Sequence, residues 1–153
     1  MFNHAPHEYP CPICLGIAGV EDERTLLRKT DLLYSDESVS VFMNSFFIRG
    51  NEGHIIIVPN VHVEHLYDLP EEIGHAVMDN AKRFAIIMKK AYACDGILLQ
   101  QHNEPAGGQH AFHFHLHVIP RYTHDDFSEQ AKNKIKTTPD ERLAFINILK
   151  KSL

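Results

Sequence analysis

Residues 112–119 read Phe-His-Phe-His-Leu-His-Val-Ile, in which apolar side chains and histidines alternate. Successive side chains of a β-strand point to opposite faces, so the pattern predicts a strand over 111–119 with its apolar side chains in a core. Its three histidines, His113, His115 and His117, would share the opposite face at intervals of roughly 6.5–7 Å. A lone histidine on a strand is usually structural, but three in register indicate metal binding or nucleophilic and acid–base chemistry on phosphate.

Four further strands are predicted from apolar and β-branched runs that are bounded by turn residues. They cover residues 31–34, 38–42, 53–59 and 97–101. The run at 53–59 is β-branched on both faces, which is typical of a central strand. Together with two helices, these strands predict an α+β fold whose mainly antiparallel sheet has about five strands.

Two helices are predicted from their start signals. Pro70 is followed by two acidic residues, which suit the first turn of a helix. A helical apolar period then runs to Ala91, and Gly96 supplies a stop. Residues 138–141 read Thr-Pro-Asp-Glu, which combines a capping residue, an N1 proline and a glutamate at the third helical position. This last helix is expected to carry three apolar residues, Leu143, Ile146 and Leu149.

The length of 153 residues fits one domain, so we expect a single domain over 1–153 with a loose N-terminus at 1–10. Hydrophobic residues make up 44% and charged residues 23%, which excludes a mainly disordered chain. The net charge of −5 argues against a basic surface for duplex nucleic acid but allows a small nucleotide ligand. No apolar run reaches the roughly 20 residues of a membrane span, and residues 1–7 do not resemble a signal peptide, so a cytoplasmic protein is expected.

Cys11 and Cys14 form a Cys-Pro-Ile-Cys pair, while Cys94 stands apart and is predicted to be a small buried hydrophobic residue. Three cysteines make a poor disulfide framework. The pair has three interpretations: a redox dithiol, which would need a preceding strand, two structural cysteines, or half of a zinc site. Zinc would need two more ligands.

Several motifs together resemble the histidine triad (HIT) superfamily of nucleotide hydrolases and transferases. The family signature is His-φ-His-φ-His-φ-φ, with φ apolar, and residues 113–119 match all seven positions. Three more motifs follow the family's order: a Cys-x-x-Cys start at 11–14, a Gly-His-x-φ-φ-φ-Pro strand at 53–59 and a Gly-rich loop at 107–109. The resemblance covers residues 11–122 and predicts a single HIT-like domain, while a C-terminal extension at about 123–153 has no matched counterpart.

The resemblance implies a hydrolase acting at the α-phosphorus of nucleoside monophosphate derivatives, such as phosphoramidates or dinucleoside polyphosphates. The middle histidine, His115, would attack phosphorus and form a nucleotidyl-histidine intermediate, which divides one hard step into two. His117 and the backbone N–H groups of Gly108 and Gln109 would hold the phosphate oxygens. A transferase is less expected, because such relatives usually carry Gln at the position of His117. A purine substrate and a homodimer are expected, as in the family.

The expected nucleotide-binding residues include positions that depart from the family. His110 stands where many members have Ser or Thr, and Asn44 stands where the family often has Asp. His102 and Asn103 compete for one position in the loop. The full expected set is Asn44, His102, Asn103, Gly108, Gln109, His110 and His117.

A structural zinc ion is also implied by the resemblance. In Cys-x-x-Cys members the histidine of the Gly-His strand and the first triad histidine complete the site, which assigns zinc to Cys11, Cys14, His54 and His113. Such a four-ligand set is typical of a closed structural site. Three other histidines, His62, His65 and His75, are predicted to be solvated or hydrogen-bonded surface groups.

The alternative function is a zinc-stabilised nucleotide-binding or scaffold protein with negligible turnover. An intact His115 with His117 beside it favours the enzyme.

Overall fold

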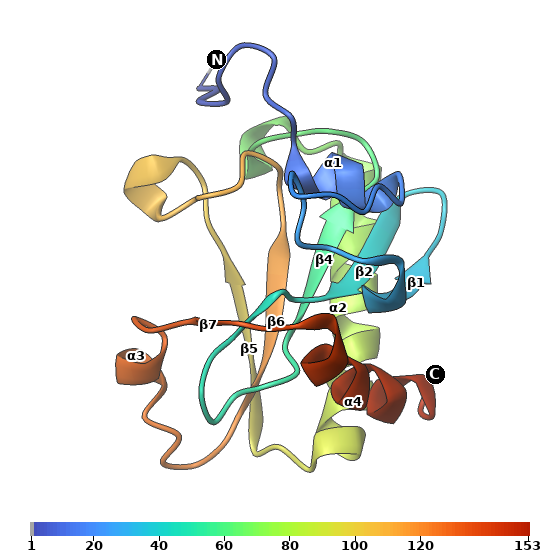
Figure 1. The fold of residues 1–153 in the computed structure, drawn as a ribbon, viewed down its shortest axis with the longest axis vertical. Coiled ribbons are helices and arrows are strands. Elements are labelled where there is room, and N and C mark those ends of the chain that lie inside the picture. The colour runs from blue at the N-terminus through green and yellow to red at the C-terminus, as the bar shows by residue number, and fades with distance from the viewer. Residues whose placement is uncertain (1) are drawn as a thin grey trace.

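The computed structural model describes residues 2–153, and its centre is a five-stranded antiparallel sheet (Figure 1). Met1, the first residue of the segment expected to be loose, lies outside the described residues. In spatial order the strands are β1 (Leu32–Ser35), β2 (Val39–Met43), β4 (Ile55–Pro59), β6 (Leu116–Arg121) and β5 (Gly96–Gln101). A smaller sheet pairs β3 (Phe46–Phe47) with β7 (Ile135–Lys136). The helices are α1 (Pro12–Ile17), α2 (Glu71–Tyr92), α3 (Phe127–Gln130) and α4 (Pro139–Lys150).

This architecture confirms the predicted α+β class, with its antiparallel sheet, long helix and C-terminal helix. None of the helices in residues 2–153 combines the length and the apolar composition that crossing a bilayer requires.

The central strands have one face in the core and the other toward a hollow. Ile55 and Ile57 of β4 belong to the main core, together with four buried residues of α2, which are Val77, Ala81, Phe84 and Met88. Ile56 points to the opposite face and lies across from His117 of β6. Figure 1 shows α2 behind the sheet, so this opposite face is left for the functional site.

Strand β6 starts at Leu116, five residues later than predicted, and continues through Pro120 to Arg121. The residues before Leu116 do not pair as a strand, and the Phe114 N–H donates to the Val63 carbonyl at 2.7 Å instead. Pro120 is tolerated because its carbonyl accepts from the side chain of Asn51 at 2.8 Å rather than from β5. In a strand the N–H and C=O of one residue point to the same edge, so the missing N–H removes no bond between β5 and β6.

Both predicted helices form, with two corrections at the level of residues. Helix α2 ends with Ala93 in the left-handed region (φ 50°), whereas Gly96 begins β5. Helix α4 starts with the predicted capping box at Thr138. Its Leu143 is 41% exposed, and the buried polar position is Arg142, whose guanidinium would be costly in a core without a partner.

The N-terminal segment has no helix or strand over residues 2–10, but it is held to the domain by hydrogen bonds. The Phe2 carbonyl accepts from His65 Nε2 at 2.8 Å, and the buried Glu64 carboxylate accepts from the His4 N–H at 2.9 Å. His65 was predicted to be at the surface and is instead fully buried, because residues 2–5 cover it.

The C-terminal extension returns across the sheet. Its strand β7 pairs with β3, and Figure 1 shows this segment crossing in front of β6. Ile146 and Leu149 of α4 then join the main core. The extension is therefore an integral part of the fold, and it faces the side of the sheet that carries the histidines.

Candidate functional site

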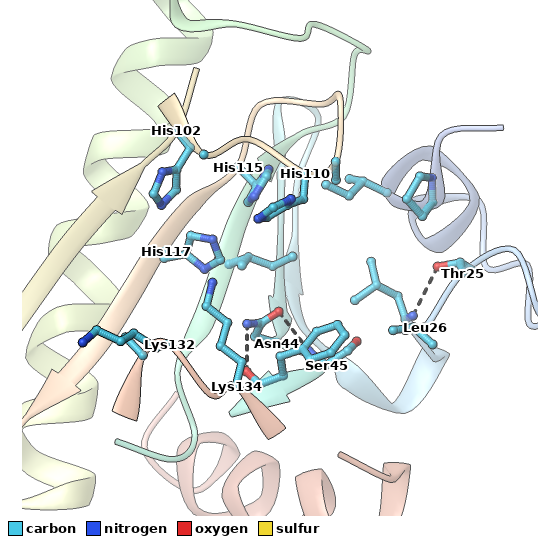
Figure 2. Close-up of a pocket in the computed structure, with 18 residues that line it drawn as sticks. Thr25, Leu26, Asn44, Ser45, His102, His110, His115, His117, Lys132 and Lys134 are labelled. Atoms are coloured by element: carbon cyan, nitrogen blue, oxygen red, sulfur yellow. Dashed lines mark hydrogen bonds between the residues drawn. The ribbon is translucent and has the colours of Figure 1, made fainter. Parts of the chain in front are cut away.

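A cavity of about 630 Å³ lies on the face of the sheet opposite α2. A second hollow of about 270 Å³ adjoins it. Both volumes are in or near the range of small-ligand sites. Figure 2 shows the labelled histidines on one side of the cavity and two lysines on another. Residues that line both hollows are His102, Gly108, His110, His117, Ala131 and Lys134.

His115 is oriented by the backbone of the residue two positions before it. Its Nδ1 lies 2.7 Å from the His113 carbonyl oxygen. A carbonyl can only accept, so Nδ1 carries the hydrogen and Nε2 keeps its lone pair in the neutral ring. Burial lowers the pKa of His115 below its ordinary value, which favours that neutral ring. The arrangement gives an unprotonated imidazole nitrogen on a side chain that lines the cavity.

His117 lies beside His115 and has no protein partner for one of its nitrogens. Its ring centre is 5.0 Å from that of His115, 5.6 Å from His54 and 6.3 Å from His102. Its Nδ1 is buried and has no hydrogen bond among the described residues. Burial, with a contribution from His115, holds the pKa of His117 well below its ordinary value. A bound ligand could satisfy such an orphaned polar atom.

Gly108 and Gln109 form a tight turn whose N–H groups are already used. The Gly108 N–H donates to the Pro105 carbonyl and the Gln109 N–H to the Glu104 carbonyl, each at 3.0 Å. The buried Gln109 side chain bonds the Glu104 N–H and the Glu64 carbonyl, each at 2.7 Å. These contacts correct the expectation that both N–H groups face a phosphate. Gly108 still lines the cavity, whereas Gln109 holds the loop together.

Of the two adjacent candidates in this loop, His102 faces the cavity and Asn103 does not. His102 Nδ1 donates to the Gly107 carbonyl at 2.6 Å, which fixes its ring. The Asn103 side chain accepts from the Leu66 N–H at 2.8 Å and anchors the loop instead. His110, at the position where many family members have Ser or Thr, is exposed and lines both hollows.

The half-buried Asn44 contacts the buried His54 at the site. Asn44 lines the larger cavity, and its amide donates to the Phe46 carbonyl at 2.9 Å and hydrogen-bonds His54 Nε2. His54 lines the smaller hollow, and burial lowers its pKa to about 3. His54 is therefore a neutral neighbour of His117.

A separate cluster brings Cys11, Cys14, His62 and His113 together. One donor atom from each lies within 4.8 Å of the others. His113 Nδ1 is 3.4 Å from both sulfur atoms, and His62 Nδ1 is 3.3 Å from the Cys14 sulfur. The other ring nitrogen of His113, Nε2, donates to the Pro59 carbonyl at 3.0 Å. The lone pair of His113 Nδ1 therefore points at the two sulfur atoms.

This donor set fits a tetrahedral zinc ion. Zinc bonds of about 2.3 Å to sulfur and 2.0 Å to nitrogen imply ligand separations of roughly 3.3–3.8 Å, close to those in the cluster. The cysteines are free thiols, and burial raises the pKa of the Cys14 thiol to about 12 in the absence of a metal ion. Metal binding would therefore release protons.

The structure corrects the ligand set that the resemblance implied, because His62 takes the place assigned to His54. His54 directly precedes Ile55, which lies across from Val118, and its ring centre is 5.6 Å from that of His117. The ring centre of His62 is instead 5.1 Å from that of His113. His62 follows the other end of β4, beside His113. In an antiparallel pairing of 53–59 with the triad segment, the residues after Pro59 lie near the start of the triad, and this signal could have identified His62 as a ligand.

The metal cluster and the cavity share parts of the chain. Cys11 caps α1 and Cys14 lies within it, while the residues between them, Pro12 and Ile13, line the cavity. His113 belongs to the cluster, and its carbonyl orients His115. An ion in the cluster would consequently fix both a wall of the cavity and the histidine beside it.

Comparison with known proteins agrees with this geometry. The HIT domain family matches residues 27–124. The chain belongs to the HIT domain family. This HIT protein is 27% identical to the Bacillus subtilis protein Hit over 124 residues, which cover 73% of this chain and 84% of that protein. A zinc-bound histidine triad family protein from Mycobacterium smegmatis has the same fold, with a TM-score of 0.74 at 24% identity over 94% of this chain and 92% of that chain.

Some relatives of this HIT protein carry the name of an activity, among them an adenylylsulfatase of Arabidopsis thaliana that is 32% identical over 75 residues, which cover 49% of this chain and 38% of that protein. The adenosine 5′-monophosphoramidase of Saccharomyces cerevisiae is 37% identical over 70 residues, which cover 46% of this chain and 42% of the yeast protein.

Proposed function

We propose that this HIT protein is a hydrolase that cleaves nucleoside monophosphate derivatives at the α-phosphorus through a nucleotidyl intermediate on His115. The observation that carries the proposal is the hydrogen bond from His115 Nδ1 to the His113 carbonyl, 2.7 Å long, in a ring that lines the cavity. It leaves Nε2 as the nucleophilic atom. The monophosphoramidase relative supports this reaction class.

In the first step, a bond forms between His115 Nε2 and the α-phosphorus while the bond from phosphorus to the leaving group breaks. The ring becomes cationic, and the His113 carbonyl stabilises its Nδ1 hydrogen. In the second step, water attacks phosphorus, the P–N bond breaks and the nucleoside monophosphate leaves. His117, 5.0 Å from His115 between ring centres, is assigned to the phosphate oxygens.

The remaining cavity residues are assigned to nucleotide binding. His102, His110 and Gly108, which line the cavity, are assigned to the phosphate, and Asn44, which also lines it, is assigned to the nucleotide as well. A purine base would pack against the apolar wall, whose members include Pro12, Ile13, Leu26, Leu27, Phe46 and Ile56.

Zinc is proposed as a structural ion held by Cys11, Cys14, His62 and His113. When bound it would supply folding free energy rather than chemistry, since all four positions are taken by protein. We assign the whole of 1–153 to one domain, because the extension shares the main core with α2.

A homodimer is also proposed. Strand β5 is an edge strand of the five-stranded sheet and carries the exposed Leu99, and α2 exposes Met78 and Ile86. These residues suit a paired surface of apolar character. Sedimentation of the purified protein should give a dimer that Leu99→Glu weakens, whereas a monomer at micromolar concentration would contradict the assignment.

The decisive experiment compares turnover of an adenosine 5′-phosphoramidate and a diadenosine polyphosphate by the wild-type protein and two variants. His115→Asn should abolish release of AMP while leaving the melting temperature and AMP binding near wild type. His75→Asn is the matched control, because His75 is exposed on α2, and it should keep full activity. Binding of AMP without turnover of either substrate would favour a nucleotide-binding protein instead.

A further inference from the structure

The C-terminal extension contributes side chains to the site, although its sequence had suggested no role there. Ala131, Lys132 and Lys134 line the larger cavity, and Ala131 and Lys134 also line the smaller hollow. Lys134 comes directly before β7, which pairs with β3 through Ile135 and Lys136. The backbone next to Lys134 is thereby held against β3.

Two lysines at this wall have different surroundings. The Lys132 ammonium is paired with Glu129 at 2.7 Å, and both side chains are 67% exposed. Lys134 takes part in none of the ion pairs within residues 2–153. Figure 2 shows its ammonium directed into the cavity, toward His117. Lys134 is therefore a cation that the protein leaves without an opposite charge.

The groups that face Lys134 are uncharged or cationic. Neither hollow is lined by an acidic side chain of the described residues. The lysine charge adds to burial in lowering the pKa of His54 and His117, which is consistent with its position near both. A cation directed at neutral rings in a cavity without carboxylates is suited to an anionic ligand.

We infer that Lys134 binds a phosphate group beyond the α-phosphorus, so that the site prefers nucleotides with a phosphoanhydride leaving group over phosphoramidates. This inference rests on the proposed function and chooses between the two substrate classes. Lys134 lines the smaller hollow together with His102 and His117, so a leaving group there would lie beside the α-phosphate at the triad.

The charge that develops on the leaving group explains how Lys134 would favour cleavage of a phosphoanhydride. When the phosphoanhydride bond breaks, its electron pair stays on the departing oxygen, and the leaving group is a phosphate anion that needs no proton at that moment. An ammonium group beside it stabilises the developing charge. An amine leaving group carries no phosphate for Lys134 to bind.

The test separates binding from turnover. In the His115→Asn background, which cannot form the intermediate, Lys134→Met should weaken binding of ATP and ADP by roughly 10–100-fold, as expected for a hydrogen bond to a charged group, and AMP by about 3-fold or less. Lys136→Met is the matched control, because Lys136 is exposed and lines neither hollow, and it should leave all three affinities within about 3-fold. In protein with His115 intact, Lys134→Met should lower kcat/KM for a diadenosine polyphosphate and spare the phosphoramidate.

Equal weakening of AMP and ATP would overturn the inference, because it would place Lys134 at the α-phosphate. Equal effects of the Lys136 and Lys134 substitutions would overturn it as well, since a general surface charge would then suffice. Lys134→Arg should restore most of the preference for ATP. If neither substrate is turned over but ATP binding still depends on Lys134, the proposed hydrolysis fails while the phosphate contact stands.

Discussion

Removing one partner of the buried ion pair between Arg142 and Asp31 should be among the most destabilising single substitutions. Arg142 is 2% exposed and Asp31 is fully buried. The guanidinium donates to both carboxylate oxygens, at 2.7 and 2.8 Å, and also to the carbonyls of Thr137 and Leu26, at 2.8 and 3.3 Å. Arg142→Met would leave the carboxylate with one remaining bond, from the Arg28 N–H at 2.8 Å.

Removing one partner of such a pair costs about 3–5 kcal/mol, because an uncompensated charge stays in the core. A chain of this length loses about 2–4 °C in Tm per kcal/mol, so the expected drop is roughly 6–20 °C. Urea unfolding at pH 7 measures the free energy and thermal unfolding measures Tm, both monitored by circular dichroism. Because Arg142 also holds the Thr137 carbonyl, three residues after Lys134, the variant should weaken ATP binding too.

Arg24→Met is the matched control, since Arg24 is paired with Asp22 in solvent and its loss should leave the midpoint unchanged. The double variant Asp31→Asn with Arg142→Met should lose less than the sum of the two single variants. A loss below about 1 kcal/mol for Arg142→Met, or an equal shift for the control, would refute the reasoning about the buried charge.

Two further predictions concern the histidines. His117→Ala should lower turnover by about 10²–10⁴-fold, as for loss of a positioned phosphate donor, and an equal loss in AMP binding would make it a binding residue only. His62→Ala should lower the zinc content of protein purified without added metal and reduce its melting temperature, whereas His54→Ala should retain zinc. Inductively coupled plasma mass spectrometry measures the zinc content, and the opposite pattern would restore His54 as the ligand.

Much of the fold follows from local sequence patterns. The β-branched run at 53–59 produced β4 within two residues, and the Thr138 capping box produced α4, because both signals act over a few neighbouring residues. The start of β6 did not follow from alternation. His113 instead contacts the sulfur atoms of Cys11 and Cys14, which lie about a hundred positions earlier in the chain.

The site was predictable where residue type alone fixes the chemistry. His115 and His117, two of the three triad histidines, line one cavity, and so do His102 and His110, which the family resemblance suggested. Lys134 was missed because only the pairing of β7 with β3 brings it there.

The most direct test of the proposed mechanism is intact-protein mass spectrometry during turnover of a diadenosine polyphosphate. We predict a transient species heavier than the free protein by one adenylyl group, with peptide mapping placing the group on His115. The species should disappear in His115→Asn and persist in His75→Asn. Turnover by the wild type without any adduct, together with a tenth or more of the wild-type rate in His115→Asn, would contradict the covalent mechanism.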